Sequence, residues 1–276
     1  MSQLINNLNK NICFIGAGNM STAIIAGLIK KGFPSDKIMA SNPSTPKLDT
    51  LAADFRIKVT QDNQEAVDFA NIIIMAVKPQ MMQQVCSDLV FSQDKVLVSI
   101  AAGIKVDRLS SFSRHTSPII RVMPNTPSAI GLGMSGIYAS DDVNEADTQM
   151  LVQIMSSVGK AIIVKNEEDI DTVIAAAGSS PAYFFLIAEA MQKEVINMGM
   201  SPEQARILIE QAMLGSATLM QQSPSLEFCT LRANVTSKGG TTAKAVESLQ
   251  QSNINDIMAK AMRSAVKRAQ EMSKQF

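Results

Sequence analysis

The segment Asn11–Lys31 reads NICFIGAGNMSTAIIAGLIKK. Its first five residues, Asn11–Ile15, form a short apolar run that predicts a β-strand. From Met20 to Lys31 the apolar side chains recur at the spacing of one helix face, which predicts an α-helix. Gly16 and Gly18 stand between the two elements. A strand, a glycine turn and a helix in this order indicate the first βαβ unit of an α/β sheet.

The glycine turn has the pattern GxGxx, with Ser21 in the position of a third glycine. Gly16 permits a tight turn, Gly18 allows the backbone to approach a pyrophosphate, and the following helix offers its first N–H groups to an anion. The sequence therefore predicts a dinucleotide site here, the alternative being a glycine-rich turn without a ligand. The expected cofactor contacts in this turn are Gly16, Ala17, Gly18, Asn19 and Met20.

The end of the second predicted strand bears on the choice of cofactor. A site for NAD(H) usually places an acidic residue there to bind the ribose diol. In this chain Ser41, Asn42 and Ser44 follow the strand, and the first acidic residue is Asp49. Lys47 can face a 2′-phosphate, although a solvent-exposed lysine on a helix explains it equally well. We therefore expect NADPH as the cofactor, with NADH as the alternative.

Two further turns follow predicted strands at the same edge of the sheet. Ligands of open α/β sheets bind outside the carboxyl ends of the strands. The expected cofactor contacts in these turns are Ala76, Val77, Lys78 and Pro79 after the fourth strand, and Ala101 and Ala102 after the fifth.

Short apolar runs alternate with helical patterns over residues 1–166, which predicts a doubly wound parallel sheet. The predicted strands are Asn11–Ile15, Lys37–Ser41, Ile57–Thr60, Ile72–Ala76, Val96–Ile100 and Ile119–Val122, with two more near Met134–Ala139 and Ala161–Val164. Only helical patterns follow, at Asp169–Ala177, Pro181–Met198, Pro202–Gln221, Leu226–Val235, Thr241–Gln251 and Ile254–Lys274. Ser180 and Ser201, each followed by proline, are the predicted N-caps of two of these helices. We therefore expect a nucleotide-binding α/β domain over residues 1–166 and an all-helical domain over residues 167–276.

Composition narrows the class of protein. Lys plus Arg and Asp plus Glu each number 25, so the zero net charge gives no reason to expect nucleic acid or an anionic membrane as a partner. The three cysteines are scattered, which favours a reducing compartment and predicts neither a disulfide framework nor a metal site. We recognise no secretory signal and expect a cytoplasmic protein. The segment Tyr183–Met198 is apolar over more than half its circumference, which predicts a homo-oligomer formed through the C-terminal half.

A second group of small and polar residues opens a predicted helix far from the glycine turn. Ser237, Gly239, Gly240, Thr241 and Thr242 offer successive backbone N–H groups and hydroxyls, which suit a carboxylate. These residues can equally serve only to turn the chain and cap the helix.

Several motifs together resemble the pyrroline-5-carboxylate reductase family over nearly the whole chain. They are FIGAGNM at 14–20, AVKPQ at 76–80, SIAAGI at 99–104, RVMPNTP at 121–127, GSSPAYFF at 178–185 and LRANVTSKGGTTAKAV at 231–246. The last motif is highly specific for this family. Many members have proline where this chain has Lys238, which affects the rigidity of a flanking turn.

The resemblance implies reduction of L-1-pyrroline-5-carboxylate to L-proline with NAD(P)H, the last step of proline biosynthesis. It implies an N-terminal Rossmann domain and a helical C-terminal domain that forms an intertwined homodimer, often assembled into a decamer of five dimers. By motif position, Thr242 matches the threonine whose hydroxyl approaches the substrate ring nitrogen. Ser237, Gly239, Gly240 and Thr241 match the cradle for the substrate carboxylate, and Asn125 is a further expected substrate contact.

The chemistry implied by this resemblance does not require a strong enzymic acid. A protonated cyclic imine accepts hydride readily, so orientation matters more than a tuned base. This suits a chain with one histidine, His115, which we expect at the surface, and we expect Lys238 to face solvent.

Two other classes of protein remain as alternatives. The β-hydroxyacid dehydrogenases use a lysine on the helix that enters the second domain, but the nearest lysine here is Lys193. A non-catalytic nucleotide sensor would have no need of the cluster at 237–242.

Overall fold

The computed structural model describes residues 10–114 and 118–275 of the chain. The chain divides into two compact units. The first extends to Pro181 and also contains the segment from Ser264 onward, and the second is Ala182–Arg263. This division lies later than the predicted domain boundary at 166/167 and returns the end of the chain to the first unit. The buried side chains of Ile170, Ile174 and Ala269 form a small apolar cluster within the first unit, which accounts for the difference.

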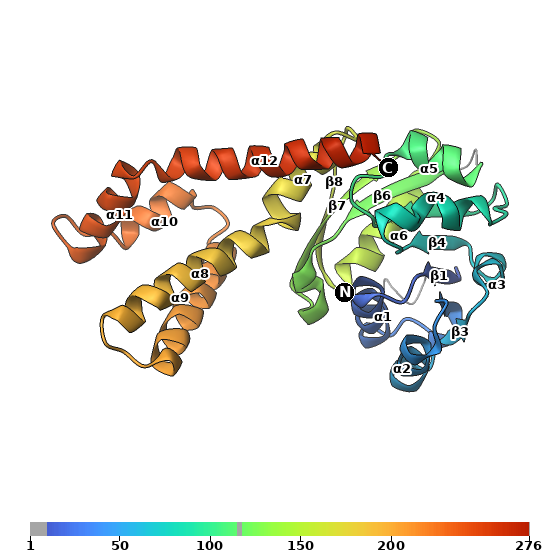
Figure 1. Ribbon diagram of the computed structural model, residues 1–276, viewed down its shortest axis with the longest axis horizontal. Helices are drawn as coiled ribbons and strands as arrows, with labels where there is room; N and C mark the ends of the chain where they lie inside the picture. Colours follow the sequence, from blue (N-terminus) through green and yellow to red (C-terminus); the bar gives the residue numbers. More distant parts are fainter. Residues whose placement is uncertain (1–9, 115–117, 276) are drawn as a thin grey trace. The chain divides into compact units, whose positions relative to one another are not determined.

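The first unit contains an eight-stranded sheet in the order β3-β2-β1-β4-β5-β6-β7-β8 (Figure 1). This order reverses between β1 and β4, as in a doubly wound fold, so the predicted fold class is confirmed. The strands are β1 (Ile12–Ile15), β2 (Ile38–Ser41), β3 (Lys58–Thr60), β4 (Ile72–Met75), β5 (Val96–Ser99), β6 (Ile119–Met123), β7 (Gly133–Ala139) and β8 (Gly159–Ile163).

The last two strands run opposite to the rest of the sheet, and the sequence pattern left their direction open. Strands β1 to β6 run parallel, but β7 pairs with β6 in the antiparallel direction, with Val122 opposite Ile137. Only residues 124–132 connect these two strands, including the 3₁₀ helix η3 (Thr126–Ile130). A parallel crossover needs a dozen or more residues, so this connection forces the chain to turn back. β8 then pairs parallel to β7.

Helices cover both faces of the sheet in the first unit (Figure 1). Side chains alternate along a strand, so Phe14 joins one apolar core and Cys13 joins the other. The first core includes buried residues of α1, α2 and α6, and the second those of α3, α4 and α5. The bounds are α1 (Asn19–Lys30), η2 (Ser35–Lys37), α2 (Thr45–Phe55), α3 (Asn63–Phe69), α4 (Pro79–Ser87), α5 (Val106–Ser113) and α6 (Glu145–Ser156).

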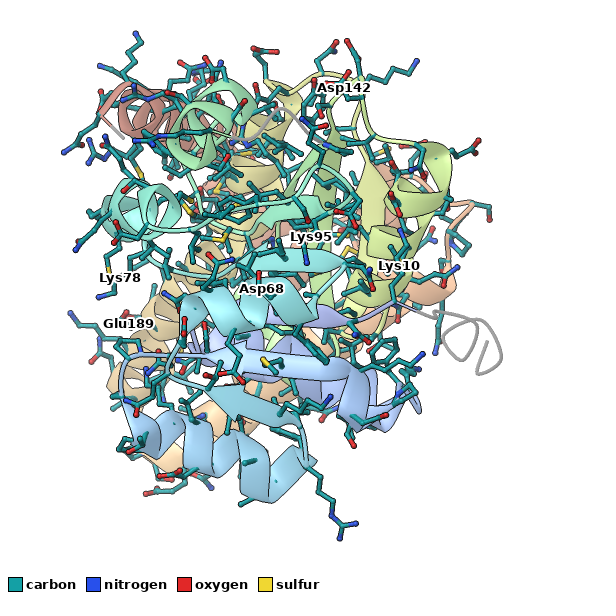
Figure 2. All side chains as sticks on the ribbon, turned by 90° about the vertical axis from the view of Figure 1, so that its right-hand side faces the viewer. Lys10, Asp68, Lys78, Lys95, Asp142 and Glu189 are labelled. Carbon is teal, nitrogen blue, oxygen red and sulfur yellow. The ribbon has the colours of Figure 1, made fainter. Side chains whose placement is uncertain are left out.

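The carbonyls at the end of α3 are satisfied by a lysine from outside the helix. Lys95 Nζ donates to the carbonyl oxygens of Val67 and Ala70, both at 2.7 Å, and to that of Asp68 at 3.1 Å (Figure 2). Terminal carbonyls of a helix have no partner within it, and a cation is favourable there. This contact fixes α3 against the residues that lead into β5.

The chain remains helical from Asp169 to Asn197, where the sequence predicts two helices. α7 (Asp169–Val173) continues into a π-helical turn, η4 (Ile174–Gly178), and then into α8 (Ser180–Asn197). The Ser179 N–H donates to the carbonyl of Ile174 at 2.7 Å, the wide spacing of a π-turn. The predicted N-cap at Ser180 is therefore wrong. Pro181 cannot donate to the backbone, and the π-turn accommodates it without ending the helix.

The second unit is helical, as predicted. It contains most of α8, then α9 (Pro202–Gln222), α10 (Phe228–Asn234), α11 (Thr241–Gln251) and the first part of α12 (Ile254–Gln275). The predicted N-cap at Ser201 is confirmed, since its hydroxyl accepts from the Gln204 N–H and the Gln204 side chain accepts from the Ser201 N–H.

Large apolar side chains remain exposed on the second unit. Phe185 is 69% exposed, and Phe184, Leu186 and Ile187 beside it are also exposed. The helical stretch Asp169–Asn197 is long and apolar enough to cross a membrane by length and composition, since an 18-residue window within it has a mean hydropathy of 1.4. That property is weak evidence for a membrane span, because a surface that packs against another protein chain needs the same apolar residues.

Candidate active site

The glycine turn lies between β1 and α1, as predicted. Gly16 adopts a φ of +108°, and a Cβ there would lie 2.9 Å from the carbonyl oxygen of Ala76, so only glycine fits. The buried Ser21 donates its hydroxyl to the Gly16 carbonyl at 2.6 Å. This hydrogen bond fastens the first turn of α1 to the turn before it.

The space beside the Gly18 backbone is open, in contrast to that beside Gly16. Gly18 is the N-cap of α1, it offers no side-chain cap, and a Cβ there would have no neighbour within 4 Å. The first N–H groups of α1 therefore have space in front of them and the positive end of the helix dipole behind them. This geometry fits a pyrophosphate, because a phosphate oxygen can approach the backbone where a side chain would stand.

A cleft of about 920 Å³ extends from this turn along the carboxyl edge of the sheet. Among the predicted cofactor residues, those lining it are Gly16, Ala17, Gly18, Ser41, Asn42, Ala76, Val77 and Lys78, together with Lys47. The remaining ones, Asn19, Met20, Ser44, Pro79, Ala101 and Ala102, are not in its lining.

Hydrogen bonds connect the end of β2 to the glycine turn. The Asn42 side chain accepts from the Ala17 N–H at 3.4 Å and donates to both the carbonyl and the hydroxyl of Ser44, at 3.0 and 2.9 Å. Ser41 is fully buried and donates its hydroxyl to Asn63 at 2.6 Å. The hydrogen of the Ser41 hydroxyl is therefore already engaged within the protein.

The sequence reasoning missed the segment after β3. Residues Gln61, Asp62, Asn63 and Gln64 line the same cleft. Asp62 caps α3, because its carboxylate accepts from the N–H groups of Gln64 and Glu65. Their position at the end of a predicted parallel strand was the signal that could have identified them.

The turn before α11 has the shape expected of an anion cradle. Gly239 has a φ of +75°, which favours glycine, and the Gly240 N–H donates to the Ser237 carbonyl at 3.0 Å. Gly240 is the N-cap of α11 and has no side chain that could accept a hydrogen bond. The N–H groups of Thr241 and Thr242, which begin the helix, therefore receive no cap from it. Ser237, Lys238, Thr241 and Thr242 are exposed.

Asn125 has a defined structural environment. Its side-chain oxygen accepts from the Met134 N–H at 2.8 Å, and its amide nitrogen donates to the Ala177 carbonyl at 3.0 Å. The residue is 8% exposed. Its amide therefore connects the loop after β6 to β7 and to the π-turn.

The two buried thiols add no second reactive centre. Burial raises the pKa of the Cys86 thiol to about 12 and that of Cys13 further still, so neither is a ready nucleophile. Within residues 10–114 and 118–275, no cluster of three His, Cys, Asp or Glu side chains is arranged to bind a metal ion. His115 lies outside the described residues.

Two protein-family models match the chain. The one described as pyrroline-5-carboxylate reductase dimerisation matches residues 167–272. The one described as NADP oxidoreductase, coenzyme F420-dependent, matches residues 11–103. The dimerisation match includes the exposed apolar residues of α8, so the chain is a homo-oligomer, as predicted from that surface.

Full-length relatives agree with these matches. The pyrroline-5-carboxylate reductase of Vibrio alginolyticus is 48% identical over 270 residues, which cover 97% of this chain and 99% of that protein. The enzyme of the same name from Escherichia coli (strain K12) is 36% identical over 271 residues, covering 97% of this chain and 100% of that protein.

Solved structures extend the comparison to the fold. A pyrroline-5-carboxylate reductase from Coxiella burnetii superposes with a TM-score of 0.90 at 36% identity, covering 96% of this chain and 98% of that one. A pyrroline carboxylate reductase from Plasmodium falciparum with NADP bound gives a TM-score of 0.85 at 26% identity, with the same coverage. The glycine turn, the turn before α11 and these full-length relatives lead to one conclusion: the chain belongs to the pyrroline-5-carboxylate reductase family.

Proposed function

We propose that this protein reduces L-1-pyrroline-5-carboxylate to L-proline with NAD(P)H, as the final step of proline biosynthesis. The observation that carries the proposal is the match to reductases of that name over nearly the full length of both chains. The chain has both binding features that the reaction requires. One is a cleft that fits a dinucleotide, and the other is a helix N-terminus that suits a carboxylate.

The cofactor supplies the hydride, and the protein supplies binding and orientation. The N–H groups at the start of α1 hold the pyrophosphate beside Gly18. The turn Ser237–Thr241 holds the substrate carboxylate through backbone N–H groups. The Thr242 hydroxyl contacts the ring nitrogen of the protonated imine. These roles need fixed geometry rather than a group with a shifted pKa.

NADPH is the preferred cofactor in this proposal. The residues that follow β2 include no acid that could bind a ribose diol, and Asp62, the acid that follows β3 in the cleft lining, is already engaged as the cap of α3. Lys47 lines the cleft at the start of α2 and can pair with a 2′-phosphate. Asn42 is held next to the glycine turn by the hydrogen bond from the Ala17 N–H, and Ser44, whose hydroxyl accepts from Asn42, can offer that hydroxyl as a neutral donor.

The assembly is a homodimer that can associate into a decamer of five dimers. The exposed apolar side chains of α8 support a large interface, and the mass of the native protein by light scattering tests the number of subunits. The protein acts in the cytoplasm in this proposal. Cys13, Cys86 and Cys229 are free thiols, which fits a reducing compartment, and cell fractionation tests this location.

One assay separates the proposed activity from the alternatives. In the first arm, purified protein is mixed with NADPH and pyrroline-5-carboxylate. In the second, it is mixed with NADP⁺ and a set of 3-hydroxy acids. In the third, it is mixed with NADPH and no substrate. We expect turnover with pyrroline-5-carboxylate only. Turnover of a hydroxy acid instead would indicate a dehydrogenase of the rival class, and binding of NADPH without turnover of any substrate would indicate a sensor.

A further inference from the structure

The loop Ala101–Lys105 joins β5 to α5 at the carboxyl edge of the sheet. β5 pairs with β4, with Ser99 opposite Met75, and the Ile100 N–H donates to the Met75 carbonyl at 3.2 Å. A dinucleotide in a doubly wound fold crosses this edge at the point where the strand order reverses, between β1 and β4. With the pyrophosphate at the glycine turn after β1, the nicotinamide half extends toward the turns after β4 and β5.

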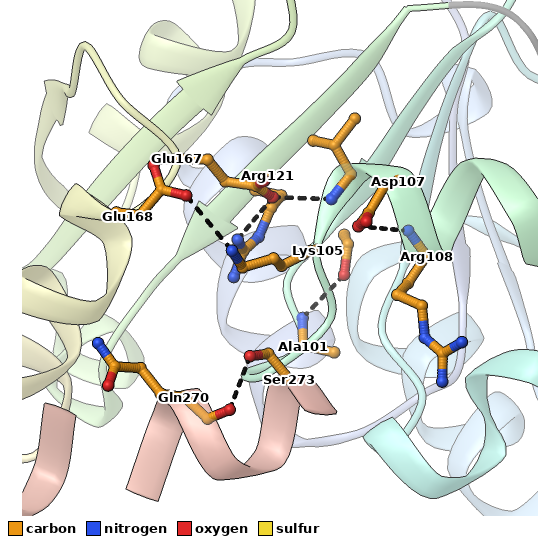
Figure 3. A network of polar contacts seen from close by, with 11 residues as sticks. Ala101, Lys105, Asp107, Arg108, Arg121, Glu167, Glu168, Gln270 and Ser273 are labelled. Carbon is orange, nitrogen blue, oxygen red and sulfur yellow. Dashed lines mark hydrogen bonds and ion pairs between the residues drawn. The ribbon is translucent and has the colours of Figure 1, made fainter. Parts of the chain in front are cut away.

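A carboxylate far along the chain holds one end of this loop. Glu167 Oε1 accepts from the N–H of Val106, the first residue of α5, at 2.7 Å. The same oxygen accepts from Arg121 Nη1 at 2.7 Å (Figure 3). α5 has no cap from its own N-cap residue, Lys105, so Glu167 takes that role. The Arg121 side chain is 4% exposed and that of Glu167 is 16% exposed, so the ion pair is shielded from water.

The C-terminal helix holds the middle of the loop. Gly103 has a φ of +77°, and a Cβ on it would lie 2.8 Å from the Cβ of Met272 in the last turns of α12. Such a close approach leaves room for glycine only. Figure 3 draws Ala101 and Lys105 of the loop in the same view as Gln270 and Ser273 of this helix. Gly103 and Met272 belong to the same compact unit.

Neither Glu167 nor Met272 lines the cleft, and the loop itself is also not among its lining residues, so both contacts act on the loop from outside the cleft. The Ala101 N–H also donates to the buried Ser99 hydroxyl at 3.2 Å. The loop is thus fixed at its start, its middle and its end by groups that do not face the cleft.

We propose that Glu167 and Met272 are positioning residues that fix the loop Ala101–Lys105 in the conformation that receives the nicotinamide half of NAD(P)H. The inference rests on the proposed function in one respect, that the bound dinucleotide is NAD(P)H. Arg121 holds the Glu167 carboxylate in place, and α12 braces the loop through its contact with Gly103. Catalysis in this proposal depends on the position of a loop whose first three residues, Ala101–Gly103, offer only backbone and small side chains.

The first test compares two neighbouring glutamates. Glu167→Gln keeps the shape of the side chain but removes the charge that pairs with Arg121. Glu168→Gln is the matched control, because the Glu168 side chain is 69% exposed and pairs with Lys105 at 3.3 Å on the surface. We expect the Kd for NADPH, titrated without substrate, to rise about fivefold or more in Glu167→Gln and to stay within about twofold in Glu168→Gln.

The second test compares two glycines with the same backbone conformation. Gly103→Ala introduces the clash with Met272. Gly131→Ala is the control, because Gly131 has a φ of +76° but nothing within 4 Å of an added Cβ. Both variants carry the strain of a left-handed alanine, so the melting temperature falls in both. Only Gly103→Ala is expected to raise the Kd for NADPH, by about fivefold or more, as the loop is displaced.

The inference is overturned if folded Glu167→Gln or Gly103→Ala protein binds NADPH with the wild-type Kd, whatever its melting temperature. If Glu167→Gln yields no folded protein, the two glycine variants decide the question. Because these titrations contain no substrate, they remain interpretable if the protein does not reduce pyrroline-5-carboxylate. That failure would instead contradict the proposed function.

Discussion

The side-chain nitrogen of Asn125 donates a 3.0 Å hydrogen bond to the carbonyl oxygen of Ala177. Ala177 is the residue four positions before Pro181. In a regular helix its carbonyl would accept a hydrogen bond from the N–H of residue 181, which proline lacks. Asn125 supplies the missing donor from the loop after β6. This contact shows how a π-turn and a proline persist inside one helical stretch.

Replacing Asn125 by aspartate should destabilise the protein. The carboxylate can still accept from the Met134 N–H, but it cannot donate to Ala177 and places a buried charge beside that carbonyl. We expect a loss of about 1–3 kcal/mol in the free energy of unfolding at neutral pH, measured by urea denaturation. Burial would hold the pKa of this carboxyl above its value in the unfolded chain. The loss of unfolding free energy should therefore shrink as the pH falls below the folded pKa and the carboxyl is protonated. Wild-type stability at neutral pH would show that the hydrogen bond is unimportant.

The two glycines of the nucleotide turn should respond differently to alanine. Gly18→Ala fits the backbone, since φ is −83° and no atom lies near the added Cβ. We expect a melting temperature within about 2 °C of wild type but a Kd for NADPH raised about tenfold or more. Gly16→Ala should lose about 1–3 kcal/mol of stability, because its φ is +108° and the Cβ meets the Ala76 carbonyl. Unimpaired NADPH binding by Gly18→Ala would place the pyrophosphate elsewhere.

Lys47 should determine the preference for NADPH. Lys47→Ala is expected to lower kcat/KM for NADPH about tenfold and to leave the value for NADH within about twofold, because only NADPH carries the 2′-phosphate. Lys31→Ala, an exposed lysine outside the cleft lining, is the control and should change neither value. Equal losses with both cofactors would assign Lys47 to a general electrostatic role instead.

Thr242 should affect turnover more than the fold. Thr242→Val keeps the size of the side chain and removes the hydroxyl at an exposed helix position, so the melting temperature should change by less than about 2 °C. We expect kcat to fall about tenfold or more if the hydroxyl contacts the ring nitrogen in the transition state. Thr242→Ser, which keeps the hydroxyl, serves as the matched control. A valine variant with wild-type kcat and KM would remove Thr242 from the mechanism.

Asp171 should make stability depend on pH. Burial raises the pKa of this carboxyl; Arg121 and Lys105 oppose that effect, and Glu168 and Glu167 add to it. When the pKa of an acidic group is higher in the folded than in the unfolded state, the protein loses stability as the pH rises through the folded pKa. Asp171→Asn should therefore be more stable than wild type at pH 7, with the difference disappearing in acid. Asp142→Asn, at an exposed aspartate (Figure 2), is the control substitution.

Much of the fold and part of the site follow from local sequence. Strand β1, the glycine turn and α1 were predictable because apolar spacing and glycine conformations are local properties. The capping box at Ser201 was predictable for the same reason. The π-turn was not, since the Ala177 carbonyl within it accepts from Asn125 in the loop after β6, 52 positions away. The contact of Glu167 with Val106 was hidden for the same reason, with 61 positions between them.

The proposed reaction is tested most directly by measuring its stoichiometry. Purified protein is given NADPH and pyrroline-5-carboxylate, and both the NADPH consumed and the L-proline formed are quantified, with the Gly18→Ala variant in parallel. We expect one L-proline for each NADPH oxidised by the wild-type protein, and a much slower reaction in the variant at low NADPH. Oxidation of NADPH without formation of L-proline, or no oxidation at all, would contradict the account.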